Sequence, residues 1–176
     1  VEYLAEYAGI PVPKPSKQDE KLERQRLNNY ELLEQICCFY QEQLYQSVGK
    51  EGLLYLRNRG LSDETIKKFR LGFAPAGNKI KEMLDAKKVP IEQQKELGVL
   101  YFPEEKGKHI HDYFRDRVMF PIFDKKGKVI AFGGRIIGEG DPKYLNSPVT
   151  PFYKKENILY GLNFASGQAR KRQTIL

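Results

Sequence analysis

The sequence predicts a mixed α+β fold, in which N-terminal helices precede a small mixed or antiparallel sheet that contains a hairpin. Apolar residues recur at spacings of three and four from about Leu22 to Val48, which indicates a long amphipathic helix. Later, the apolar run VMFPIF (118–123) is followed by the turn DKKG and a second run at Val129–Phe132, the pattern of a hairpin. The 176 residues suffice for one cored domain with a small subdomain attached.

The first twenty residues are predicted to form a helix and a tether. VEYLAEYAGI (1–10) has apolar residues at helical spacing and meets a glycine stop at Gly9. PVPKPSKQDE (11–20) has three prolines in its first five residues, which favours an extended linker. We therefore place a domain boundary near Lys21, separating residues 1–20 from residues 21–176.

Short elements should follow the long helix, which we expect to end at Gly49. Helices are predicted at Gly52–Arg59 and directly after Ser62, which caps a helix with Asp63 and Glu64 in its first turn and Thr65–Phe69 continuing it. LGFAP (71–75) has the composition of a short strand that stops at its proline, and residues 78–88 and 91–97 favour two further helices.

Prolines and glycines should interrupt the predicted strands, and further elements are expected after them. Pro121 cannot donate to a ladder, so its strand is expected at an edge or bulged there, and Gly133-Gly134 is expected to interrupt the returning strand. GDPKYLNSPVTPFYKK (140–155) has the composition of a loop. A helix is predicted from about Asn163, and the final QTIL, which ends at Leu176, resembles a strand just beginning, so we expect the chain to be part of a larger protein.

Charge is unevenly distributed along the chain. The net charge is +7, with 16 Lys and Arg against 15 Asp and Glu in residues 1–100 and 14 against 8 in residues 101–176. A concentrated basic excess is expected of a nucleic-acid binder, although it also occurs in proteins that bind none. No apolar run is long enough to span a bilayer and no signal peptide is visible. The only cysteines, Cys37 and Cys38, favour buried thiols in a reducing cytoplasm.

The sequence offers no recognisable metal or covalent catalytic site. The carboxylates of the basic half form no tight D-x-D cluster, and there is no P-loop and no Ser/His/Asp or Cys/His set. His109 and His111 alternate on a possible strand and are interpreted as exposed or structural residues.

Cations on short elements are the stronger signal. Arg115 and Arg117 are two apart, so in a strand both would point to one face, and Arg135 follows two glycines that permit close approach of a ligand. Tyr144 could stack on a base and Asn146 could hydrogen-bond a base edge or a sugar. The alternatives are that the two arginines pair with Asp112 and Asp116 and that Tyr144 belongs to the core.

The same residues carry a family resemblance. DYFRDRVMFPIFDKKGKVIAFGGR (112–135) and PKYLNSPVTPFYK (142–154) resemble the central region of bacterial replicative DNA primases, the DNA-directed RNA polymerases that start Okazaki fragments. YLRNRGLSDETIKKFRLGFAP (55–75) is similar to the upstream segment of that family, and VEYLAEYAGIPVP (1–13) looks like the last helix of its zinc-binding domain with the tether after it.

The resemblance implies the N-terminal subdomain of the polymerase core, which faces the metal-binding Toprim subdomain across a basic groove for single-stranded template DNA and nucleoside triphosphates. The residues that match the basic groove or its neighbouring basic motif are Arg59, Arg115, Arg117, Arg135, Lys143, Tyr144, Asn146 and Lys154.

The resemblance also implies groups that this chain does not supply. The Toprim subdomain and its metal-binding carboxylates are expected after Leu176, so no catalytic residue is expected within the chain. Mg²⁺ or Mn²⁺ and Zn²⁺ would be bound outside it, and the full-length protein would contact a replicative helicase and a single-strand-binding protein. A cytoplasmic location at the nucleoid and the replication fork, no membrane contact, and a monomeric fragment are further expectations.

One departure and two alternatives remain. The chain has Val149 where the family commonly has an acidic residue after Ser-Pro, which should weaken local capping or an ion pair there. A non-catalytic module that binds single-stranded DNA or docks on a replisome is the first alternative. The second is an interaction scaffold whose long helix docks a partner, in which case Lys143→Ala and Arg135→Ala would leave DNA binding unchanged.

Overall fold

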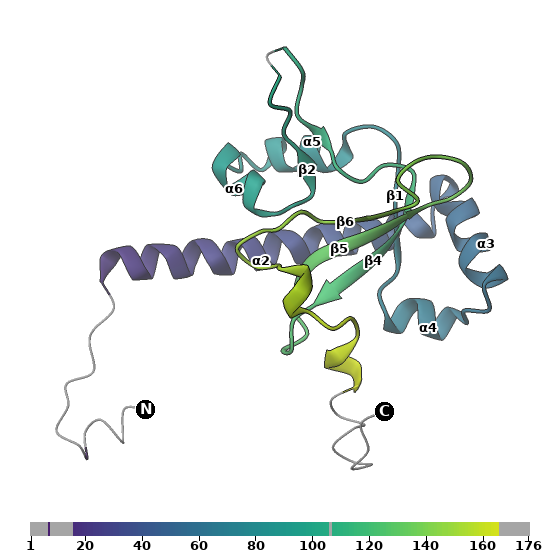
Figure 1. Ribbon diagram of the computed structural model, residues 1–176, viewed down its shortest axis with the longest axis horizontal. Helices are drawn as coiled ribbons and strands as arrows, with labels where there is room; N and C mark the ends of the chain where they lie inside the picture. Colours follow the sequence, from purple (N-terminus) through teal and green to yellow (C-terminus); the bar gives the residue numbers. More distant parts are fainter. Residues whose placement is uncertain (1–6, 8–15, 106, 166–176) are drawn as a thin grey trace.

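The computed structural model describes residues 7, 16–105 and 107–165 (Figure 1). The expected first helix, most of the tether and the final strand up to Leu176 lie outside these residues. The expectation that the Toprim subdomain begins after Leu176 therefore stays a prediction. The fold class is confirmed, because helices precede a small antiparallel sheet.

The helices and strands follow one another in the order that the sequence predicted, with several short additions. In chain order the elements are α2 (Lys17–Leu44), η1 (Ser47–Gly49), α3 (Lys50–Asn58), α4 (Asp63–Lys68), β1 (Gly72–Ala74), α5 (Lys79–Ala86), α6 (Ile91–Glu96), β2 (Leu100–Tyr101), β3 (His111–Asp112), β4 (Arg117–Phe123), β5 (Val129–Ile136), β6 (Tyr144–Asn146) and η2 (Lys155–Asn157).

The long helix α2 begins earlier and ends earlier than the sequence predicted. Ser16 and Asp19 form a reciprocal capping box, in which each side chain accepts the other residue's backbone N–H, so the helix starts at Lys17 within the expected linker. The helix ends at Leu44 rather than at Val48. A side chain on Gly49 would lie only 2.2 Å from the carbonyl oxygen of Gln43, so this glycine lets the chain turn closely around the end of the helix.

The main sheet has the strand order β1-β4-β5-β6, and every neighbouring pair is antiparallel. The strand that contains Pro121 was expected to lie at an edge or to be bulged there; it is not an edge strand, but the second alternative agrees with a register irregularity just after the proline. Strand β4 is central, but β1 pairs only with its residues Arg117–Met119, so Pro121 has a partner on one side alone. A register irregularity follows at Ile122 and Phe123, as expected for a proline-containing strand.

The expected interruption at Gly133-Gly134 does not occur, because β5 runs unbroken through both residues. The two glycines instead permit close packing on opposite faces of the sheet. A side chain on Gly134 would come within 2.8 Å of the Phe114 ring in the core, whereas one on Gly133 would meet the amide oxygen of Asn146 at 3.1 Å.

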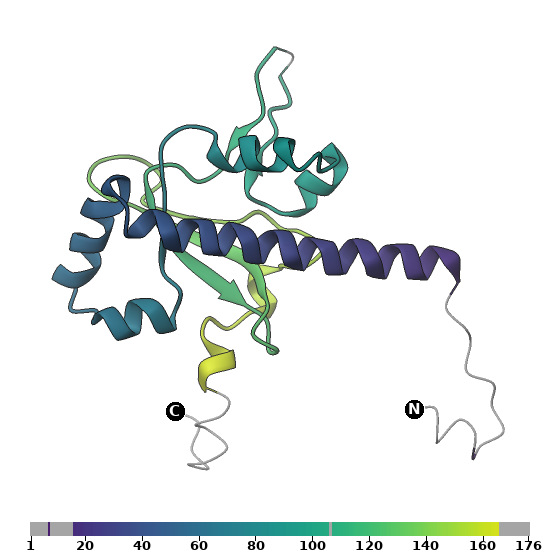
Figure 2. The ribbon, with the colours of Figure 1, turned by 180° about the vertical axis from the view of Figure 1, so that it is seen from behind.

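Helix α2 covers one face of the sheet, passing behind it in Figure 1 and in front of it in Figure 2. Its buried side chains Leu33, Ile36 and Tyr40 pack in one cluster with Met119 and Phe132 of the sheet. On the other face, two smaller clusters leave the middle of the sheet uncovered. Leu56 of α3 and Ile66 of α4 pack against Val118 at one end, and Tyr153 packs against Ile122 and Ala131 at the other.

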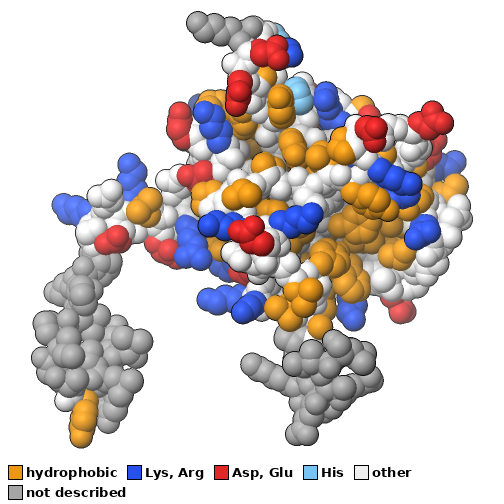
Figure 3. Space-filling model, in the orientation of Figure 1, with side chains coloured by type: hydrophobic (Ala, Val, Ile, Leu, Met, Phe, Trp, Pro, Cys, Tyr) orange, Lys and Arg blue, Asp and Glu red, His pale blue; other side chains and the backbone are white. Residues whose placement is uncertain are grey.

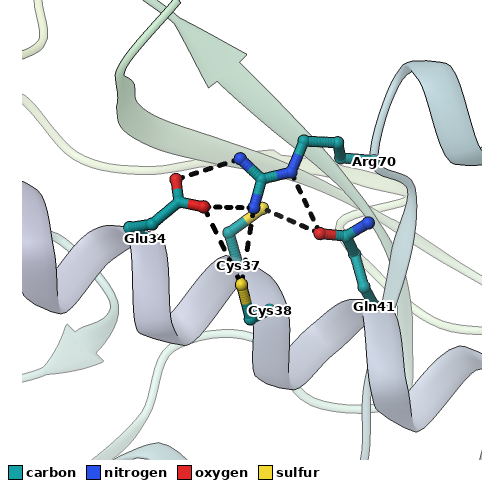
Figure 4. Close-up of polar contacts among 5 residues, drawn as sticks. All are labelled: Glu34, Cys37, Cys38, Gln41 and Arg70. Atoms are coloured by element: carbon teal, nitrogen blue, oxygen red, sulfur yellow. Dashed lines mark hydrogen bonds and ion pairs between the residues drawn. The ribbon is translucent and has the colours of Figure 1, made fainter.

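A polar cluster also joins α2 to Arg70, two residues after the end of α4 (Figure 4). The Arg70 guanidinium donates to both carboxylate oxygens of Glu34, and its Nε donates to the Gln41 side chain at 3.0 Å. Arg70 has a positive φ of 55°, which turns the chain from α4 into β1. Cys38 is exposed beside this cluster and Cys37 is buried under it, so only one of the two thiols expected to be buried is so.

A two-stranded ladder of β2 and β3 carries His111 and fixes α5. The buried Asp112 carboxylate accepts the backbone N–H groups of Ile80 and Lys81, at 2.8 Å each, at the start of that helix. Burial raises the pKa of this carboxyl group, while the two hydrogen bonds oppose the rise. Among the described residues, no helix combines the length and apolar character needed to cross a bilayer.

Candidate nucleic-acid interface

The predicted loop 140–155 contains a strand that the sequence did not reveal. Tyr144–Asn146 form β6, which adds to the edge of the sheet beside β5. In this register Tyr144 lies opposite Arg135, and Asn146 lies opposite Gly133. Because directly opposed residues on antiparallel strands share a face, the pairing brings two segments of the predicted site together on the uncovered face of the sheet.

The Arg135 side chain lies between two tyrosine rings. Its guanidinium carbon is 4.3 Å from the centroid of the Tyr55 ring on α3 and 5.6 Å from that of the Tyr144 ring. Its Nε–H also donates to the Tyr144 hydroxyl at 3.2 Å. These contacts hold a planar cation, with nitrogens left over, at the end of the uncovered face.

Two further cations act on the same tyrosine. The Arg135 hydrogen bond is the main cause that lowers the pKa of the Tyr144 phenol, and the charges of Arg135, Lys143 and Arg59 add to the effect. We call Arg59, Arg135 and Lys143 the cation group. Tyr144 is 67% exposed, which excludes the alternative that it belongs to the core.

A hollow of about 280 Å³ opens beside the cation group, and we call it the Gly133 hollow. Gly133 and Gly134 form its floor, and its walls are mainly apolar. In Figure 3, hydrophobic side chains gather to the right of centre on this face, with Lys and Arg side chains beside them. The wall residues are Phe120, Ile122, Tyr144, Leu145, Asn146 and Tyr160.

Arg115 and Arg117 do not share a face, contrary to the expectation from their spacing. Strand β4 begins only at Arg117, because Asp116 has a positive φ of 51° that turns the chain between the two arginines. Arg117 is 6% exposed and donates to the carbonyl oxygen of Pro142 at 2.8 Å, so it supports the segment that carries Lys143. Arg115 is exposed and lines a separate hollow with Tyr101, His109 and His111. Within the described ranges, neither arginine forms the ion pair considered above.

The remaining predicted residue, Lys154, lies just before η2 and is exposed. It is not part of the wall of the Gly133 hollow or of the cation group. The loop before it is held without an acidic residue at Val149, because the Thr150 hydroxyl accepts the backbone N–H groups of Phe152 and Tyr153 at 3.2 and 3.1 Å. The expected weakening of local capping is therefore offset by Thr150.

Sequence reasoning missed several residues of the interface: Tyr55 beside Arg135, and Phe120, Ile122, Leu145 and Tyr160 around the hollow. Tyr55 and Arg59 are four residues apart, a spacing that places both on one side of α3 and that could have indicated a shared surface. Phe120 is hidden in an uninterrupted apolar run, and Tyr160 is distant in sequence, so neither carries a local signal. Within the part of the chain that the structure describes, no group of three or more His, Cys, Asp or Glu side chains could hold a metal ion.

Comparison with known proteins identifies the class to which this fold and interface belong. The family profile described as the N-terminal domain of the DNA primase catalytic core matches residues 39–166. The chain is 44% identical over 173 residues to a DNA primase of Pasteurella multocida and 41% identical over 165 residues to that of Escherichia coli K12, in both cases covering 92% of this chain and 28% of the relative. The chain belongs to the DNA primase family and spans little more than a quarter of these curated relatives.

Solved structures agree with this membership. A DnaG primase catalytic domain bound to single-stranded DNA superposes with a TM-score of 0.72 at 39% identity, over 84% of this chain and 46% of that one. An Aquifex aeolicus primase with zinc-binding and RNA polymerase domains gives a TM-score of 0.71 at 33% identity, over 97% of this chain and 40% of that one.

Proposed function

We propose that this chain is the part of a DNA primase that holds single-stranded template DNA and incoming nucleoside triphosphates during primer synthesis. The observation that carries the proposal is the cation group around Tyr144, placed beside an apolar hollow on the uncovered face of the sheet. Cations neutralise phosphates, and an aromatic platform next to them suits an unpaired base. The primase relatives and the structure of a relative bound to single-stranded DNA support this assignment.

The chemistry of nucleotide addition is assigned to residues outside this chain, in a Toprim subdomain that follows Leu176. Two-metal phosphoryl transfer needs gathered carboxylates, and the cation group contains none. In this proposal Mg²⁺ or Mn²⁺ and Zn²⁺ are bound by other parts of the full-length enzyme, which acts in the cytoplasm at the replication fork with a helicase and a single-strand-binding protein. We therefore expect the 176-residue chain alone to bind single-stranded DNA and to synthesise no primer.

The test is a salt titration of single-stranded DNA binding, measured by fluorescence anisotropy. Each lost phosphate contact should lower the slope of log affinity against log salt concentration by about 0.7 to 1. Lys143→Ala and Lys154→Ala are compared with Lys125→Ala, an exposed lysine in the turn at the opposite end of the β4–β5 hairpin. Arg135→Ala is measured in the same way. If neither Lys143→Ala nor Arg135→Ala changed the salt dependence of DNA binding, the result would favour the alternative of an interaction scaffold whose long helix docks a partner.

A further inference from the structure

The Gly133 hollow lies where two cross-strand rows of the sheet meet. One row consists of Phe120, Gly133 and Asn146, and the other ends in Arg135 and Tyr144. Gly133 is the central residue of the first row, and the Asn146 amide oxygen would lie 3.1 Å from a side chain placed there. The absence of a side chain on Gly133 therefore creates the depth of the hollow.

The lining of the hollow is suited to a ring rather than to a charge. Phe120, Ile122 and Tyr160 contribute apolar side chains, whereas the Leu145 side chain packs in the core on the other face, and no carboxylate, lysine or arginine among the described residues lines the hollow. An ionised phosphate would lose hydration here without gaining a counter-charge, whereas a flat base would bury apolar area. Its volume of about 280 Å³ lies just below the range of about 300–1,000 Å³ typical of drug-sized ligands, which suits one base.

Polar side chains at the edge of the Gly133 hollow could bind the polar atoms of a base and its phosphates. The Asn146 side chain has no hydrogen-bond partner among the residues that the structure describes, and an amide can both donate to and accept from a base edge. Arg135 donates to the hydroxyl of the wall residue Tyr144, and Lys143 precedes Tyr144 in the chain, so both cations lie near the side of the hollow along which the phosphates that flank a seated base would pass.

We propose that the Gly133 hollow takes one unstacked base of the single-stranded DNA, with its flanking phosphates on the cation group. This inference rests on the proposed function, because it assigns a subsite within the same interface. It commits to a base of the strand, and occupation by the base of a free nucleotide is an outcome that the test separates.

The test uses an oligonucleotide with only one base, because a strand with many bases could shift along the interface and place another base in the hollow. A fully abasic oligonucleotide is compared with the same oligonucleotide carrying a single base at its centre, and the chain's affinity for each is measured by anisotropy. Seating one base should raise the affinity at least about fivefold, the lower end of the range for stacking a base on an aromatic side chain.

Gly133→Val is the main variant, because it fills the floor. Its backbone is not in the left-handed region, the nearest atom is the movable end of Asn146, and valine favours strands. This variant should lose the single-base gain while keeping the salt slope of the abasic strand. Tyr160→Leu should also reduce the gain, and Leu159→Ala, whose exposed side chain lies outside the hollow, should retain it.

The outcomes separate this inference from the proposed function. Salt-dependent binding with no single-base gain in the unmodified chain would overturn the subsite alone. Loss of the gain in Leu159→Ala as well as in Tyr160→Leu would also count against it. If free nucleoside triphosphate abolished the gain without displacing the abasic strand, the hollow would belong to the nucleotide instead. Absence of any salt-dependent binding would overturn the proposed function itself.

Discussion

The Arg135 guanidinium lies 4.3 Å above the ring of Tyr55, a residue of another element and 80 positions earlier in the chain. Tyr55 thus sets the position of a predicted DNA-binding cation without being charged. Tyr55 is half-buried against the hydrophobic cluster that includes residues of α2, α3, α4 and β4. The packing of this cluster therefore helps to position the ring that the Arg135 guanidinium contacts.

Replacing Tyr55 should affect DNA binding through Arg135. Tyr55→Leu removes the ring face and should weaken single-stranded DNA binding about two- to fivefold, as expected for an exposed cation–π contact. The salt slope should not change, because the charge remains. Tyr55→Phe keeps the ring and serves as the control in the anisotropy measurement. An equal loss in Tyr55→Phe would show that the hydroxyl, rather than the ring face, is what matters.

Arg117 should matter for stability more than Arg115 does. Its buried guanidinium donates to the carbonyl oxygen of Pro142, and removing a charged donor of this kind typically costs about 1.5–3 kcal/mol. We expect Arg117→Ala to lower the free energy of unfolding by about 2 kcal/mol in urea, and Arg115→Ala to change it by less than about 0.5 kcal/mol. The reverse order of the two effects would refute a supporting role for Arg117.

The Glu34–Arg70 pair should show a modest coupling energy. The two side chains are 46% and 25% exposed, so solvent screens the pair, and a double-mutant cycle should give about 1 kcal/mol, decreasing with added salt. Because Arg70 has a φ of 55°, Arg70→Gly should be about 1 kcal/mol more stable than Arg70→Ala in urea unfolding. Equal stability of those two variants would mean that the turn relaxes without strain.

Stability should fall at alkaline pH because of Cys37. Burial raises the pKa of its thiol from 9.0 to about 12, so above pH 9 the unfolded chain loses this proton while the folded chain retains it. The stabilisation is complete below pH 9 and is lost as pH rises from about 9 to 12. Between about pH 8 and pH 10 the unfolding free energy of the unmodified chain, relative to Cys37→Ala, should fall by roughly 1.4 kcal/mol. A constant difference would show that the thiol titrates in both states alike.

The sequence could predict the elements with strong local signals. The apolar spacing of α2, the Ser62 cap of α4 and the Asp124–Gly127 turn between β4 and β5 depend on near neighbours, and all three are present. The end of α2 was misplaced because Val48 continues its apolar spacing, although the close turn at Gly49 had already ended the helix.

The parts that escaped prediction depend on partners distant in sequence. Tyr144–Asn146 are strand residues because β5 pairs with them, although prolines flank them on both sides. Arg115 and Arg117 face different surroundings because a positive φ at Asp116 turns the chain between them, and sequence spacing does not report that angle. The cation group and the Gly133 hollow combine residues of β4, β5 and β6 with Arg59 at the end of α3, Lys143 before β6 and Tyr160 near the end of the described chain, so their membership depends on tertiary structure.

The two adjacent glycines of β5 should tolerate amino-acid substitution differently. Gly134 faces Phe114 in the core, where any larger residue should reduce the yield of folded protein, whereas Gly133 faces the uncovered side, where a larger residue should spare folding and impair binding. A saturation library of residues 132–135 can be selected once for the abundance of folded protein and once for DNA capture. Substitutions at residues 132 and 134 should then mainly reduce abundance, whereas those at residues 133 and 135 should mainly reduce DNA capture. The strand would then reveal which of its faces serves folding and which serves the nucleic acid.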